Sequence, residues 1–83
     1  MTINVVYFAW LRERIGIPSE VIETKATTVS ALVEELRNRE ARYQVAFADL
    51  GAVRVAVDQT LTDFNATLDG ASEVAFFPPM TGG

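Results

Sequence analysis

The sequence predicts an α+β fold, a mixed β-sheet with one main helix packed across one of its faces. Three observations predict this fold. Apolar residues alternate in short runs near both ends and in the middle of the chain, which is typical of half-buried strands. Residues 29–36 instead carry apolar residues at helical spacing. The chain has 83 residues, 49% hydrophobic and 22% charged, so its size and composition suit one globular domain with one modest core.

Two strands are expected in the first third of the chain. The first spans residues 3–9, which are rich in valine and aromatic residues, and the second spans residues 20–24. Alternation divides the first strand into one face with Ile3, Val5 and Tyr7 and an opposite face with Asn4, Val6 and Phe8. The second of these faces is unusually apolar. Between the strands, residues 10–15 are expected to form one helical turn that ends at Gly16.

The main helix is expected to begin after Thr28, whose side chain suits the N-cap position. One buried stripe with helical spacing is formed by Val29, Leu32, Val33 and Leu36. Glu35 and Arg39 lie off this stripe and are expected to form a favourable i, i+4 pair. Tyr43 and Phe47 are expected to continue the apolar cover in a second short helix or turn.

The second half of the chain predicts three more strands. The first alternates Val53, Val55 and Val57 with less apolar residues. A turn at Asp58-Gln59 leads into a short strand at residues 60–62, and Asp69-Gly70 marks a second turn. The last strand spans residues 73–77, with Val74 and Phe76 on one face and Ala75 and Phe77 on the other. We expect the apolar first strand to be central and to pair in parallel with the last strand if both are interior.

The composition excludes several classes of function. Seven basic residues against 11 acidic residues give a formal net charge of −4, which does not suit nucleic-acid binding because phosphates require a basic patch. The chain has no cysteine and no histidine, so no metal site and no enzyme acting alone are expected. No stretch approaches the ~18 apolar residues of a membrane span. The start of the sequence has no signal-peptide pattern, so a cytoplasmic location is expected.

Residues 78–83 are expected to form an extended tail after a domain of residues 1–77. Pro78 and Pro79 end the last strand because they lack backbone donors, and they favour an extended backbone. Gly82 and Gly83 have no side chains, so the terminal carboxylate can enter a narrow active site on another protein. Once activated, for instance as an acyl-adenylate, a carboxylate accepts sulfur or an amine. The alternative is a frayed and inert terminus.

The sequence resembles the small, sulfur-carrying subunits of molybdopterin synthases along its whole length. The most specific match is the C-terminal octet Phe76-Phe77-Pro78-Pro79-Met80-Thr81-Gly82-Gly83. Further matching segments are Val6-Tyr7-Phe8-Ala9, Leu11-Arg12-Glu13, Val55-Ala56-Val57-Asp58-Gln59, Asp69-Gly70 and Glu73-Val74-Ala75. The departures are small: members of this family often have Asn in place of Asp58 and a β-branched residue in place of Met80, and Trp10 has no assigned family role.

The resemblance implies a ubiquitin-like β-grasp roll and a role as sulfur carrier in molybdenum cofactor biosynthesis. A ubiquitin-activating-type enzyme would use ATP to adenylate Gly83, and a sulfur relay would convert it to a thiocarboxylate. The tail residues Pro78, Pro79, Met80, Thr81 and Gly82 would thread into the large subunit of a heterotetrameric synthase. There the sulfur would pass to cyclic pyranopterin monophosphate. The resemblance places the catalytic residues in the large subunit, and we expect the chain itself to bind no cofactor.

A docking surface for the partner is expected near the root of this tail. Phe8 and Phe77 lie on the faces opposite the expected core, and they would be neighbours if the first and last strands pair. The resemblance also places Leu61 beside them. Aromatic side chains are common energetic centres of interfaces, which favours the two phenylalanines over Leu61.

Other charged residues have simpler interpretations. Turn chemistry and solubility account for the spread-out carboxylates of Asp58, Asp63, Asp69 and Glu73 better than a paired-carboxylate catalytic site does. Arg12 and Arg14 are expected on a solvated face, with salt bridges to a partner as the alternative.

Three alternatives to the molybdopterin role remain open. The chain could carry sulfur for thiamine or cysteine synthesis, or act as a ubiquitin-like modifier of lysines. Both roles would use the same activated carboxylate. It could also be an interaction module with an inert tail.

Overall fold

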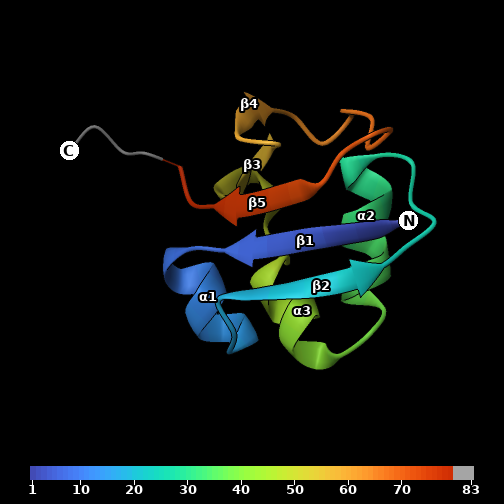
Figure 1. Ribbon diagram of the computed structural model, residues 1–83. Helices are drawn as coiled ribbons and strands as arrows, with labels where there is room; N and C mark the ends of the chain where they lie inside the picture. The colour runs from blue at the N-terminus through green and yellow to red at the C-terminus, as the bar shows by residue number, and fades with distance from the viewer. Residues whose placement is uncertain (80–83) are drawn as a thin grey trace.

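The computed structural model describes residues 1–79 of the chain (Figure 1). Nine elements follow one another in this part: β1 (Thr2–Tyr7), α1 (Ala9–Ile15), β2 (Ser19–Glu23), α2 (Val29–Arg37), α3 (Ala41–Ala46), the short 3₁₀ helix η1 (Leu50–Ala52), β3 (Arg54–Val57), β4 (Thr60–Thr62) and β5 (Glu73–Phe77). The five strands expected from the sequence are all present, with boundaries that shift by one or two residues.

The five strands form one mixed sheet in the order β2-β1-β5-β3-β4. β1 pairs with β5 in parallel, and the other three pairings are antiparallel. The parallel pairing expected for the first and last strands is therefore confirmed. The central position belongs to β5, with β1 beside it, because the β3–β4 hairpin adds two strands on the far side of β5.

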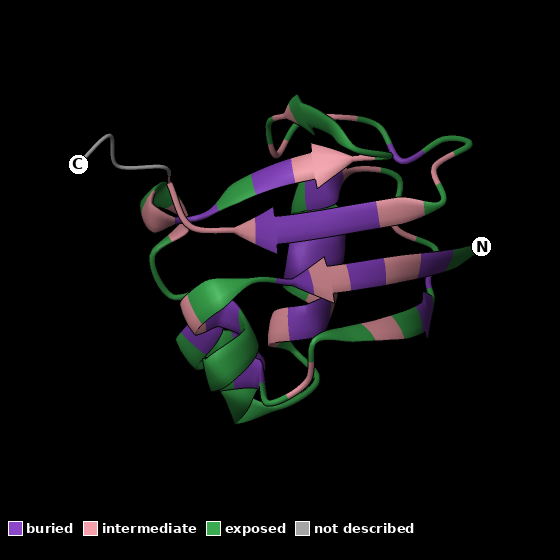
Figure 2. Ribbon diagram, turned by 60° about the vertical axis from the view of Figure 1, so that its left-hand side comes forward, coloured by how far each residue is buried: buried purple, intermediate pink, exposed green. Residues whose placement is uncertain are grey.

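Helices α2 and α3 lie behind the sheet in Figure 1, and the core lies between them and the sheet. The four residues of the α2 stripe are buried, as are Ile3, Val5, Tyr7, Val55, Val74 and Phe76 from the facing side of the sheet. Figure 2 shows this burial concentrated along the central strands and the inner side of the helices. The opposite face, which we call the outer face, carries the alternate residues of each strand.

Helix α2 begins as expected, because the Thr28 hydroxyl accepts a hydrogen bond from the Ala31 N–H at 3.1 Å. The prediction of an i, i+4 ion pair between Glu35 and Arg39 is wrong. The helix ends at Arg37, so Arg39 lies beyond the region in which i, i+4 neighbours face each other. Glu35 instead accepts a hydrogen bond from the hydroxyl of the buried Thr24.

Left-handed backbone conformations close three of the connections. Gly16 has φ +96° and ends α1 as expected, with its N–H donating to the Arg12 carbonyl at 2.7 Å. Asp58 and Gln59 both have positive φ and form a two-residue hairpin turn between β3 and β4. Gly70 has φ +74° in the turn expected at Asp69-Gly70.

A polar cluster ties the edge strand β2 to β1 and α3. The Tyr7 and Tyr43 hydroxyls both donate to Glu20 Oε2, at 2.8 and 2.6 Å. Arg39 lies 3.7 Å from the other oxygen of the Glu20 carboxylate. Burial, followed by the hydrogen bond to Glu20, raises the pKa of both Tyr7 and Tyr43 above the ordinary tyrosine value. The uncharged phenols therefore stabilise the folded state.

We predict that the free energy of unfolding falls as the pH rises above about 10, the ordinary pKa of tyrosine. Both phenols have a higher pKa in the folded state than in the unfolded chain, so their contribution is complete below that pH and is lost above it. Replacing Tyr7 by Phe lowers the free energy of unfolding at neutral pH by about 1–2 kcal/mol. The same substitution also makes the fall in the free energy of unfolding at alkaline pH shallower. Urea unfolding over a pH series measures both effects, and an unchanged alkaline slope in Tyr7→Phe/Tyr43→Phe would contradict the prediction.

Candidate functional site

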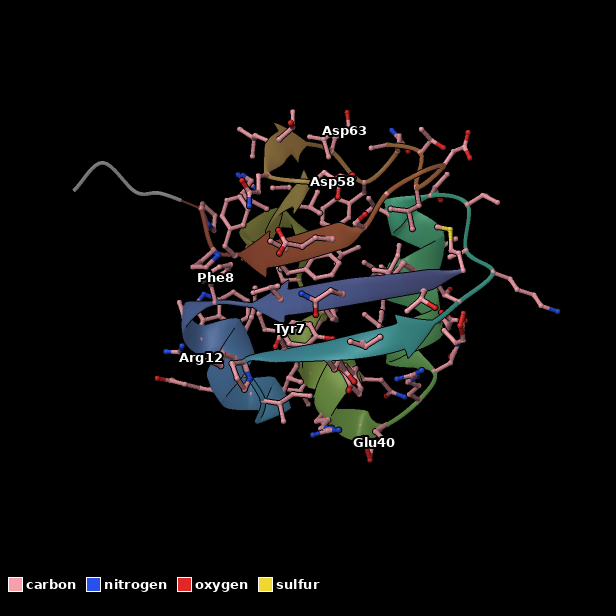
Figure 3. All side chains as sticks on the ribbon, viewed as in Figure 1. Tyr7, Phe8, Arg12, Glu40, Asp58 and Asp63 are labelled. Carbon is pink, nitrogen blue, oxygen red and sulfur yellow. The ribbon has the colours of Figure 1, made fainter. Side chains whose placement is uncertain are left out.

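The parallel pairing of β1 and β5 brings two phenylalanines together on the outer face. Tyr7 and Phe76 are register partners, and the next residues along the two strands are Phe8 and Phe77. The Phe8 N–H donates to the Phe76 carbonyl at 3.0 Å, which continues the ladder to the end of β5. Figure 3 shows Phe8 at the end of the molecule where β5 ends. The structure thus brings together the two aromatic residues that the sequence singled out.

An open groove of about 640 Å³ runs along this part of the outer face. Phe8, Phe77, Pro78 and Pro79 line one end, and Gln59 and Glu73 line the other. The floor includes Ala56 and Ala75, which are register partners on β3 and β5. The small side chains of the floor, next to the two aromatic rings, leave room for apolar side chains of another protein.

The connection between β1 and α1 holds Phe8 out of the core. Phe8 is the N-cap residue of α1 with an extended backbone, and its carbonyl accepts hydrogen bonds from the N–H groups of Leu11 and Arg12. Ala9 follows with φ +52°, in the left-handed region that non-glycine residues rarely adopt. This tight reversal leaves the Phe8 side chain 46% exposed, while Leu11 turns into the core.

Phe76 and Phe77 are neighbours in the sequence with opposite environments. Phe76 is fully buried, with its ring edge-on to Phe47 at 5.0 Å and stacked near Tyr7 at 6.3 Å between centroids. Phe77 is half-buried and lines the groove. The alternation of β5 therefore separates a core phenylalanine from a surface phenylalanine.

Leu61 lies on the same face but farther from the tail root. It is 69% exposed on β4, where its register partner is Ala56, and it is absent from the groove lining. β3 and β5 separate it from β1 in the sheet. The structure thus joins Phe8 and Phe77 in one groove and places Leu61 at the sheet edge beyond the groove floor.

The tail begins directly at the groove. β5 ends at Phe77, and Pro78 and Pro79 follow as half-buried residues of the groove wall. The remaining residues to which the sequence assigned a role, namely Met80, Thr81, Gly82 and Gly83, lie outside the described residues.

The carboxylates near this surface have roles in turns. Asp58 Oδ1 accepts hydrogen bonds from the N–H groups of Ser72 and Glu73, both at 2.9 Å, and so fixes the start of β5. Asp63 Oδ1 accepts a hydrogen bond from the Asn65 N–H at 2.8 Å. Across residues 1–79, no three metal-ligating side chains gather into a group that could hold an ion.

The arginines of α1 follow the groove residues Phe8 and Ala9 in the sequence but do not belong to the groove lining. The Arg14 guanidinium stacks over the partly buried Trp10 ring, 4.5 Å from its centroid. Arg12 is exposed and forms no ion pair within the described part of the chain.

Within residues 1–79, no helix has the length and apolar character needed to cross a membrane.

The sequence reasoning missed the groove floor and the far end of the groove. It placed Ala75 on the outer face and Gln59 in a turn, gave Ala56 no part in a binding surface, and explained the Glu73 carboxylate by turn chemistry and solubility. The alternation of β3 and β5 carries the signal for the floor, because Ala56 and Ala75 fall opposite the buried valines of the same strands.

Comparison with known proteins gives consistent matches over the whole chain. The ThiS family model matches residues 5–83. The molybdopterin synthase sulfur carrier subunit of Escherichia coli (strain K12) is 40% identical over 81 residues, which cover 98% of this chain and 99% of that protein.

Two solved structures are similar over the full length of both chains. SAMP1 from Haloferax volcanii superposes with a TM-score of 0.78 at 21% identity, a likeness that shows the fold alone. A chain in the complex of subunits 1 and 2 of the molybdopterin-converting factor from Helicobacter pylori 26695 has a TM-score of 0.64 at 26% identity. The ubiquitin-like β-grasp fold is thereby confirmed.

We predict that alanine substitutions of the two adjacent phenylalanines affect stability very differently. Phe76→Ala lowers the free energy of unfolding by about 3–5 kcal/mol, because it opens a cavity in the core. Phe77→Ala lowers it by about 1 kcal/mol or less, because the side chain lies at the surface. Urea unfolding of both variants measures the difference, and equal losses would show that Phe77 belongs to the core.

Proposed function

The chain belongs to the ThiS family, and from this premise we propose that it is the sulfur-carrying small subunit of a molybdopterin synthase. The observation that carries the proposal is the full-length similarity, at 40% identity, to the sulfur carrier subunit of Escherichia coli. The groove at the root of the tail supports it, because a carrier must dock its body while its terminus reaches into another protein.

The proposed chemistry takes place at the terminal carboxylate of Gly83. An activating enzyme transfers AMP from ATP to this carboxylate and releases pyrophosphate. A sulfur relay then displaces AMP and leaves a thiocarboxylate, whose sulfur passes to cyclic pyranopterin monophosphate in the large subunit. ATP is held by the activating enzyme rather than by this chain. The absence of histidine and cysteine from the sequence supports placing the catalytic residues in the partner.

The body of the chain docks through the outer face in this proposal. Phe8 and Phe77 are the aromatic anchors at the tail root, and Leu61 extends the contact toward the sheet edge. Pro78 and Pro79 stiffen the departure of the tail, and the residues up to Gly82 thread into the large subunit. The Helicobacter pylori complex of subunits 1 and 2 supports a large-subunit partner. We propose that the small and large subunits form a heterotetrameric synthase.

The other carrier roles use the same activated carboxylate, so the tail does not distinguish them. The Escherichia coli relative favours the molybdopterin role over thiamine or cysteine synthesis and over lysine modification.

We also propose a cytoplasmic location, because the adenylation step consumes ATP and therefore requires a nucleotide pool.

We predict that Phe77→Ala weakens binding to the large subunit by about 2 kcal/mol, or roughly 30-fold in Kd, because the variant loses an aromatic anchor. Val45→Ala is the matched control, since Val45 is 57% exposed but lies on α3, outside the groove. Calorimetric titration measures both affinities. Equal affinities for Phe77→Ala and the unmodified chain would exclude the groove as the docking surface.

We predict that the mass of the intact chain rises by the difference between one sulfur and one oxygen atom after incubation with the activating enzyme, ATP and a sulfur donor. A chain that ends in an amide should keep its mass because it offers no terminal carboxylate for adenylation. A chain that lacks Gly83 should also keep its mass, because its terminal carboxylate, now on Gly82, stops one residue short of the adenylation site. Mass spectrometry with and without ATP measures the change. An unchanged mass of the full chain would leave the inert-tail interpretation in place.

A further inference from the structure

Only some of the basic side chains within residues 1–79 form ion pairs. Arg37, Arg39 and Arg42 each form an ion pair with a glutamate. Within residues 1–79, the three arginines that pair with no carboxylate are Arg12, Arg14 and Arg54. The single lysine, Lys25, is also unpaired there, but it follows β2 at the opposite end of the sheet.

The three unpaired arginines lie on elements at the end of the sheet where the tail begins: Arg12 and Arg14 on α1, which follows β1, and Arg54 at the start of β3. The backbone N–H of Arg12 donates to the Phe8 carbonyl at 3.4 Å, and Figure 3 shows Arg12 on the same side of the molecule as Phe8. Arg54 is the register partner of Phe77, so the two side chains share the outer face. The Arg14 guanidinium is fixed over Trp10 on α1. One arginine therefore follows Phe8 by one helical turn, and another is the register partner of Phe77.

The opposite end of the sheet is acidic. Asp58 and Glu73 meet there, where the Asp58 N–H donates to the Glu73 carbonyl at 2.9 Å, and Glu23 ends β2 beside Thr2. Two carboxylates also lie near the tail end. Asp49 accepts a hydrogen bond from the Gly51 N–H, and Glu13 lies between Arg12 and Arg14 in the sequence. The tail end therefore keeps an excess of positive charge in a chain whose formal net charge is −4.

We propose that Arg12, Arg14 and Arg54 form a basic collar that meets a carboxylate-rich rim around the tail-receiving site of the large subunit. This inference rests on the proposed function. The collar orients the tail end toward the partner during encounter, before the groove makes contact. The terminal carboxylate of Gly83 is six residues beyond Phe77, at most about 20 Å along an extended chain. The collar therefore meets the rim of the receiving site, while the site itself accommodates the anionic terminus.

The overall charge of the chain argues for a protein partner rather than a polyanion. A nucleic acid carries negative charge along its whole length and would be repelled by the acidic remainder of this chain. A protein rim presents its carboxylates locally and meets only the collar. Steering of this kind raises the association rate and is screened by salt.

Stopped-flow association with the large subunit from the same organism tests the collar. Arg12→Gln/Arg54→Gln removes two collar charges and leaves the aromatic groove intact. Arg37→Gln/Arg39→Gln is the matched control, because it changes the net charge equally at the helical side of the molecule. At low ionic strength, the collar variant should associate about tenfold more slowly than the unmodified chain, and the control should stay within about twofold. At about 0.5 M salt, the difference should disappear.

Four results would overturn the collar. Equal slowing in both variants would assign the effect to net charge, and an association rate independent of salt would exclude steering. A defect confined to the dissociation rate would make the arginines ordinary contacts. A defect confined to the KM of the ATP-dependent adenylation reaction would assign the collar to the activating enzyme. If the unmodified chain fails to bind the large subunit at all, the proposed function fails together with the collar.

Discussion

The parallel pairing of β1 with β5 places Phe8, Phe77 and the root of the tail at one end of the molecule. Because the two strands run in the same direction, both end at the same edge of the sheet. α1 follows the end of β1, and the tail follows the end of β5. Phe8, Phe77 and the two prolines therefore meet in one groove. An antiparallel pairing would place Phe8 and the tail at opposite ends of the molecule.

Strand alternation then divides each strand between the hydrophobic core and the candidate docking groove. Tyr7 and Phe76 face the core, whereas the residues that follow them face the groove. The same alternation leaves alanines at the centre of the outer face, where larger side chains would fill the groove. A single strand thus contributes residues to both the core and the groove, and no separate loop is needed to form the groove. The α2 stripe covers only the inner face and leaves the outer face available to a partner.

The sequence predicted much of this because its strongest signals are local. The alternation around Val55, the cap at Thr28 and the turn at Asp58 depend on neighbouring residues, and all three are confirmed. The pairing of Glu35 with Arg39 was wrong because the helix ends between them, and helix ends depend on tertiary contacts. The Tyr7–Glu20–Tyr43 cluster joins residues from distant segments, so no local pattern indicates it. Local alternation places Ala56 and Ala75 on the outer face, but it does not indicate that the two residues are paired. The roles expected of residues 80–83 stay predictions.

NMR shift mapping can locate the surface of the chain that the large subunit contacts, which we propose is the outer face at the tail root. An isotope-labelled chain would be titrated with the unlabelled large subunit while its amide signals are followed. We expect the largest perturbations at Phe8, Ala9 and Phe77, with smaller changes along β3 and β4. Signals of the α2 stripe should change little. Perturbations centred on α2 and α3, with the groove unaffected, would show that the large subunit binds the helical side instead.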